Sequence, residues 1–278
     1  MAQAISMHRY IARLASPVIP GGLLRRKAVL VFASQVLLAA LLLVSWQRLA
    51  GGARVHAFLF GSPSAIGACL VDMVRDGSIW TDTWVTGSET LAGFILGNVL
   101  GTVIGLSLWY SKFVSRVLQP FILAIGSIPI ISIAPIVIIW FGTSFASKVA
   151  MATLSVVVVS LVTSYKGAMG VDPDQINLMK SLGARKPQIF RYLIVQASLT
   201  DIFAGLKLTV GLALVGAIVG EFMSSSQGLG HAIFKAGSLY IISKVFAELA
   251  VTIVLSLLLG AAVFRIERAL LPWRSDLQ

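Results

Sequence analysis

Six apolar segments, each long enough to cross a lipid bilayer, constrain this chain more than any other feature. They cover residues 28–49, 84–109, 117–140, 148–167, 197–221 and 247–266. A transmembrane helix needs about 20 mostly apolar residues. With 57% hydrophobic and only 12% charged residues, the composition lies outside the range of soluble domains. The sequence therefore predicts an all-α fold, a polytopic membrane bundle of about six transmembrane helices. We expect one membrane domain over 28–271, an N-terminal segment over 1–27 and a tail over 272–278.

Basic residues indicate how this bundle is oriented, because Lys and Arg accumulate in cytoplasmic loops. If both termini are cytoplasmic, the inner side carries Arg9, Arg13, Arg25, Arg26, Lys27, Lys112, Arg116, Lys166, Lys180, Arg185, Lys186, Arg191, Arg265, Arg268 and Arg274. The outer side then carries only Arg48, Arg54, Arg75, Lys148, Lys235 and Lys244. The bias predicts that both termini lie in the cytoplasm. Anionic lipid headgroups on the cytoplasmic side favour such a basic excess, so the net charge of +11 needs no nucleic-acid partner to explain it.

Residues suited to metal binding or catalysis are sparse. Cys69 is the single cysteine, so it cannot form a disulfide within the chain, and it has no His neighbour at metal-ligand spacing. No Gly-Lys-Ser or Gly-Lys-Thr occurs, so the chain lacks the phosphate-binding P-loop. We expect no catalytic residue, no metal and no cofactor on this chain, and no ATP hydrolysis by it.

The polar stretch over 168–196 interrupts two apolar segments on the predicted cytoplasmic side. Asp172 and Pro173 are suited to begin a helix, and Gly183 is suited to end it. Between them, we expect Ile176, Met179 and Leu182 to lie on roughly one face, with Leu178 beside it. An apolar face on a short cytoplasmic helix needs a partner, such as a groove on another protein. The alternative is packing on the same chain or on lipid headgroups.

Prolines and carboxylates within the predicted membrane helices are candidates for a pathway or gate. Pro129 and Pro135 interrupt the third crossing, which is tolerated where neighbours or a cavity satisfy the freed carbonyls. The alternative is a kink that serves packing. Glu221 and Glu89 lie at helix ends where burial of an ionisable group is costly and function is a common reason for it. For Glu221 the alternative is a role in fixing the outer loop.

Glycines repeat every four residues on two of the predicted crossings. Gly97, Gly101 and Gly105 lie on the second, and Gly216 and Gly220 on the fifth. This spacing permits close contact between membrane helices. We expect these residues to serve packing within the bundle.

Several motifs resemble those of bacterial ATP-binding-cassette (ABC) import permeases. Gly183 and its spacing match the cytoplasmic signature loop, although Asn177 and Gln196 replace its acidic residue and its final proline. The runs that resemble the nitrate, sulfonate and taurine group, or its pyrimidine-precursor relatives, are Pro129–Gly142, Ser181–Arg185, Ile202–Lys207, Gly216–Glu221 and Gly228–Gly230. They occur in the family's order over about residues 60 to 270.

This resemblance implies a type I ABC importer permease fold in the bacterial inner membrane. It implies a subunit that moves a small solute inward by alternating access, with an extracytoplasmic binding protein and two ATPase subunits that hold ATP and Mg. A second permease copy, in a homodimer, would complete the pathway. The implied ATPase contacts are Ile176, Asn177, Leu178, Met179, Leu182, Gly183, Ala184, Arg185 and Lys186. Sulfonate, nitrate, pyrimidine, flavin and aromatic acid remain open as substrates. The alternatives are a secondary transporter and a membrane enzyme, both working without an ATPase.

Overall fold

A computed structural model describes residues 21–51 and 59–270, and all regular elements in these residues are helices. The predicted tail and residues 1–20 of the predicted N-terminal segment lie outside the described residues. The chain divides into two compact units, 1–64 and 65–278. The first unit contains α2 (Gly21–Gly51), which begins before the predicted start at residue 28. Its stretch from Leu30 to Ala50 is long and apolar enough to span a membrane.

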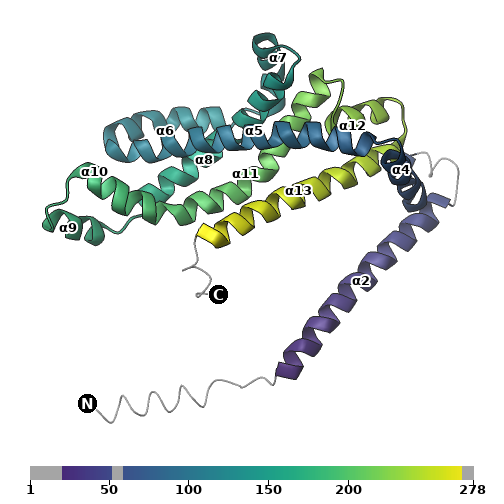
Figure 1. Cartoon of the computed structure of the whole chain (residues 1–278), viewed down its shortest axis with the longest axis horizontal. Helices are drawn as coiled ribbons and strands as arrows, with labels where there is room; N and C mark the ends of the chain where they lie inside the picture. The colour runs from purple at the N-terminus through teal and green to yellow at the C-terminus, as the bar shows by residue number, and fades with distance from the viewer. Residues whose placement is uncertain (1–20, 52–58, 271–278) are drawn as a thin grey trace. The chain divides into compact units, whose positions relative to one another are not determined.

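The second unit is a bundle in which α8 (Phe145–Met169) packs along both α5 and α11 (Figure 1). The other long helices are α5 (Ser78–Ser107), α11 (Val195–Ser224) and α13 (Ile242–Leu270). A 3₁₀ turn over Leu108–Tyr110 extends α5 at its end. Before α11 lie the short helix α10 (Lys186–Ile189) and a π turn over Phe190–Ile194. These spans confirm four of the predicted crossings, each with longer bounds.

The predicted third crossing over 117–140 is not one continuous helix. It consists of α6 (Lys112–Gly126) and α7 (Ile130–Phe141), which meet at an angle of 93°. Pro129 immediately precedes α7 with an extended ψ of 126°, whereas Pro135 lies inside α7. The break falls where proline lacks a backbone donor and its predecessor disfavours helix. By length and composition the described residues hold five spans, or six if this bent pair is one.

Short helices lie at both ends of the bundle. At one end α9 (Pro173–Ser181) and α10 follow α8, and at the other end α12 (Leu229–Ser238) follows α11 (Figure 1). A further short helix, α4 (Pro63–Arg75), precedes α5. Neither end is therefore covered by irregular chain alone, and each offers ordered side chains to solvent or to a partner.

Glycines allow the central helices to approach closely. A Cβ atom at Gly97 would lie 2.8 Å from the Cβ atom of Val156, and one at Gly101 would lie 2.5 Å from the carbonyl oxygen of Val157. On α11, a Cβ atom at Gly216 would lie 2.7 Å from the Cα atom of Ala152. Since α8 supplies all these neighbours, the predicted packing role of the glycine repeats is confirmed.

Candidate functional site

The connection between α8 and α11 is an ordered helical elbow. The Asp172 side chain accepts a hydrogen bond of 2.9 Å from the backbone N–H of Asp174 and so caps α9. At the other end Gly183 adopts a φ of +80°, and the N–H of Ala184 donates to the Met179 carbonyl at 3.0 Å. This is the left-handed helix stop that glycine favours. The predicted start and stop of this helix are confirmed.

The elbow is fixed to the ends of the membrane helices by an apolar cluster. Its buried members are Leu106, Ala168, Val171, Ile189 and Ile194, and Ile176, Met179 and Ala184 pack against them. An aromatic contact adds to it, because the rings of Tyr110 and Phe190 lie 4.8 Å apart between centroids. The Lys186 ammonium also donates to the carbonyl of Tyr110 at 2.7 Å. These contacts therefore fix the orientation of the elbow relative to the ends of α5 and α8.

The apolar residues of α9 and of its C-cap, Leu182, lie on two faces, so the prediction that Leu182 shares a face with Ile176 and Met179 was wrong. Ile176 and Met179 contact the chain's own cluster, whereas Leu178 and Leu182 are 62% and 75% exposed. Residues four apart share a helix face, so Leu178 and Leu182 form one outward apolar patch. The polar members of the predicted set, Asn177, Arg185 and Lys186, are also exposed.

At the opposite end of the bundle Glu221 joins three helices. It is fully buried, and its carboxylate accepts hydrogen bonds from the Thr86 hydroxyl at 2.6 Å and from the Gly230 N–H at 2.5 Å. The Thr86 hydroxyl in turn accepts from the N–H of Leu229 at 2.8 Å. These N–H groups belong to the first turn of α12. The N–H groups of a helix's first turn have no acceptor within the helix itself. Glu221 thus holds the start of α12 against α5 and α11.

Glu89 and Lys148 lie close to this cluster and are almost fully buried, with 3% and 1% exposure. The Lys148 ammonium donates to the carbonyls of Thr143 and Ser224, at 2.5 and 2.8 Å. One carboxylate oxygen of Glu89 is buried without a hydrogen-bond partner. Both side chains line a pocket of about 560 Å³ between α5, α8 and the segment after α11. Such an arrangement can admit a polar solute, and it is the structure's nearest counterpart to the predicted gate.

The two candidate prolines do not reach this pocket. Pro129 and Pro135 are both exposed on the surface of α7 and its start, while Ala134 and Val137 bury the opposite face of α7 against Met151. Within the described residues, no group of three His, Cys, Asp or Glu side chains is placed to hold a metal ion. These two prolines thus lie on a surface of α7 that the described part of the chain leaves uncovered.

Comparison with known proteins decides the family. Residues 97–274 match the family described as the inner membrane component of binding-protein-dependent transport systems. The chain belongs to this family. The matched region includes α7, the elbow and Glu221, so both ends of the bundle lie within it. This chain is accordingly a multi-pass membrane permease subunit of an ABC importer for small solutes, with an all-helical type I fold.

Similar permeases serve different solutes. The riboflavin transport system permease protein RibX of Chloroflexus aurantiacus is 31% identical over 85% of this chain and 88% of its own length. The formylaminopyrimidine transport permease protein ThiX of Halalkalibacterium halodurans is 32% identical over 84% and 93%. Among solved structures, an inward-facing form of the MetNI methionine ABC transporter matches with a TM-score of 0.61 at 20% identity, over 68% of this chain and 94% of that one.

Two parts of the site were not visible in the sequence. Helix α12 was not predicted, although Gly228 with a φ of +104° marks its start. Its cap comes from Glu221 and Thr86, which are distant along the chain, so the local sequence carries no capping signal. Lys148, which the charge pattern places on the outer side at the start of the crossing over 148–167, is buried, and its ammonium donates to two carbonyls at helix ends.

Proposed function

We propose that the chain couples to an ATPase through the outward patch of α9, Leu178 and Leu182. The single observation that supports this most is their exposure on a helix whose opposite face is anchored to α5 and α8. A rigid helix held at one face can transmit a displacement to the membrane helices, whereas a mobile loop would absorb it. The exposed apolar pair fits a groove on a partner.

The direction of transport and the site of ATP hydrolysis are part of the same proposal. Both termini and the elbow are cytoplasmic, where two ATPase subunits bind ATP and Mg, and this chain hydrolyses no ATP. Closure of the ATPase pair moves α9 and with it the ends of α5 and α8. Coupling requires that ATP binding differ between the two conformations of the permease. A loaded binding protein docks at the α12 end of the bundle.

A second copy of this chain completes the pathway. The bent pair α6 and α7 exposes Pro129, Pro135, Ile139 and Trp140, the last two at 80% and 72%. The polar pocket beside Glu89 opens at the same α12 end of the chain's own bundle. We infer a homodimer in which the α7 surfaces line the pathway and Glu89 and Glu221 lie near its outer gate. The names of the relatives indicate small solutes, including riboflavin and formylaminopyrimidine, for those proteins.

Site-directed cross-linking tests the α9 contact. Cys69 is the single cysteine, so Cys69→Ser provides a background in which one thiol can be placed. A thiol-attached photo-cross-linker on Leu182→Cys should capture the ATPase in native membranes. The matched control is Lys235→Cys, an exposed position on α12 at the other end of the bundle. Capture of the ATPase from Lys235→Cys and not from Leu182→Cys would reverse the proposed topology.

A further inference from the structure

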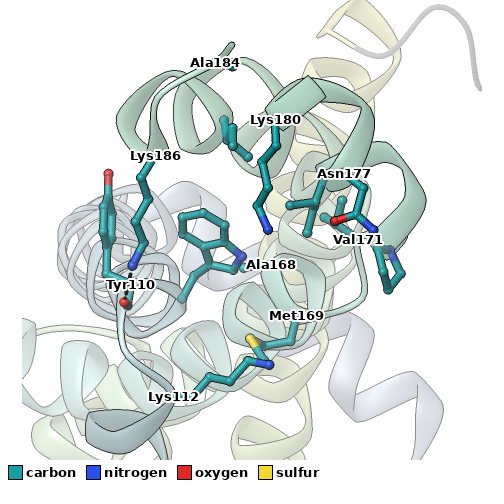
Figure 2. Close-up of a pocket in the computed structure, with 13 residues that line it drawn as sticks. Tyr110, Lys112, Ala168, Met169, Val171, Asn177, Lys180, Ala184 and Lys186 are labelled. Atoms are coloured by element: carbon teal, nitrogen blue, oxygen red, sulfur yellow. Dashed lines mark hydrogen bonds between the residues drawn. The ribbon is translucent and has the colours of Figure 1, made fainter. Parts of the chain in front are cut away.

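A second site lies behind the elbow, between α9 and the ends of the membrane helices. The pocket has a volume of about 580 Å³ and is lined by residues of the α5 end, α6, the α8 end, α9 and α10. Figure 2 shows Lys112, Lys180 and Lys186 entering it from three different elements, with Tyr110 and Met169 beside them. The lining includes no Asp or Glu.

The charge of these lysines is not neutralised by a carboxylate of the described residues. In the described part of the chain, no carboxylate forms an ion pair with any of the three. Lys186 donates to the Tyr110 carbonyl and lies 5.7 Å from the centroid of the Trp109 ring. An ammonium carries three donors, so even Lys186 retains donors for a ligand. Three ammonium groups around one hollow favour an anion with several acceptor oxygens, such as a phosphate group.

The position of the pocket indicates the source of that phosphate. The membrane spans end at Tyr110 and Met169, and both residues line the pocket. Trp and Tyr at the end of a span are typical of the headgroup level of a bilayer. Ala168 and Met169, the last residues of the span formed by α8, give the pocket lining apolar side chains next to the membrane. A lipid headgroup reaches this level without leaving the bilayer, whereas a soluble anion must compete with it.

The pocket and the proposed ATPase contact use nearly opposite faces of α9. Ile176, Asn177 and Lys180 line the pocket, whereas Leu178 and Leu182 point away from it. With 3.6 residues per turn, the two sets are separated by almost half a turn. A ligand in the pocket therefore leaves the outward patch free, and both contacts can exist together.

We propose that this pocket binds the phosphate group of an anionic phospholipid. Its placement in the cytoplasmic leaflet rests on the orientation given under Proposed function. A basic pocket between membrane helices on this side is suited to anionic headgroups, and a bound lipid would tie the elbow to the bilayer. The elbow would then be held from behind by lipid and contacted in front by the ATPase.

Native mass spectrometry of the purified full chain tests this proposal. The chain is mixed with phosphatidylglycerol or with phosphatidylcholine, and retained lipid is counted. The test variant combines Lys112→Gln with Lys180→Gln, and the matched control combines Arg116→Gln with Lys166→Gln, which removes two exposed cytoplasmic-side charges outside the pocket. We expect the test variant to weaken phosphatidylglycerol retention roughly 10- to 30-fold, at about three- to fivefold per lysine.

Further variants separate charge from folding and lipid from other anions. Lys112→Arg with Lys180→Arg keeps the charge and should keep the lipid. Equal retention by the test and control variants overturns the proposal. Binding of inorganic phosphate to the pocket without preference for phosphatidylglycerol assigns a soluble phosphate and overturns the lipid source. Loss of ATPase capture by the test variant in the cross-linking assay, with unchanged lipid retention, assigns the pocket to the ATPase and overturns the lipid proposal. Because lipid is counted without an ATPase present, failure here leaves the α9 coupling proposal standing.

Discussion

Gly183 offers the sharpest test of the elbow as a rigid connection. Its φ of +80° lies in the left-handed region, and a Cβ atom added there would meet no atom within 4 Å. A substitution is therefore strained by backbone conformation alone and not by a clash. Left-handed geometry costs most L residues roughly 1–2 kcal/mol, whereas Asn tolerates it better. Gly183→Val should thus destabilise the native turn, and Gly183→Asn should largely preserve it.

The expected effect follows from that strain energy. A change of 1–2 kcal/mol alters the ratio of native to non-native turn roughly 5- to 30-fold. If transport requires the native turn, uptake by Gly183→Val falls by up to this factor, with wild-type amounts of chain in the membrane. The assay is uptake by proteoliposomes that contain the whole importer, normalised to inserted permease, with ATP hydrolysis measured in parallel. Gly183→Asn should stay close to wild type. Equal uptake by Gly183→Val and wild type would show that transport does not depend on the native turn at Gly183.

Three further changes test other parts of the molecule. Leu178→Ser with Leu182→Ser should reduce ATPase copurification without shifting the melting temperature, because both side chains are exposed; a lowered melting temperature would show that they pack within the chain. Gly101→Ala should destabilise the fold by roughly 1–3 kcal/mol through overpacking against α8. The control Gly260→Ala has open space at its Cβ position and should not destabilise the fold. Thermal unfolding in detergent measures both. Glu221→Ala removes the acceptor of two buried donors and should destabilise by roughly 2 kcal/mol; unchanged thermal unfolding would contradict its role in holding α12.

Features set by local sequence were largely predictable. Apolar segments of membrane-spanning length predicted α5, α8 and α13, because the bilayer fixes the length that a helix needs. Asp172, Pro173 and Gly183 predicted the start and stop of α9, since caps depend on neighbouring residues. The glycine repeats predicted close packing, although not that α8 lies between α5 and α11.

Features set by contacts distant in the sequence were not predictable. Helicity alone does not show which side of α9 meets the chain's own cluster, so Ile176 and Met179 were grouped with Leu182. The first turn of α12 depends on an acceptor from α11, which no local pattern reveals. Pro129 indicates that the helix is interrupted between α6 and α7 but not that the two meet at 93°. In each case the missing information is tertiary packing.

The central claim is that this chain provides a passive pathway driven by a separate ATPase through α9. Its most direct test is solute uptake by proteoliposomes that contain the full-length chain, the ATPase that copurifies with it and the loaded binding protein. We predict uptake that depends on ATP and on the ATPase, and that is lost when Leu178→Ser and Leu182→Ser are combined. Uptake by the purified chain alone, with neither ATP nor ATPase, would contradict the account.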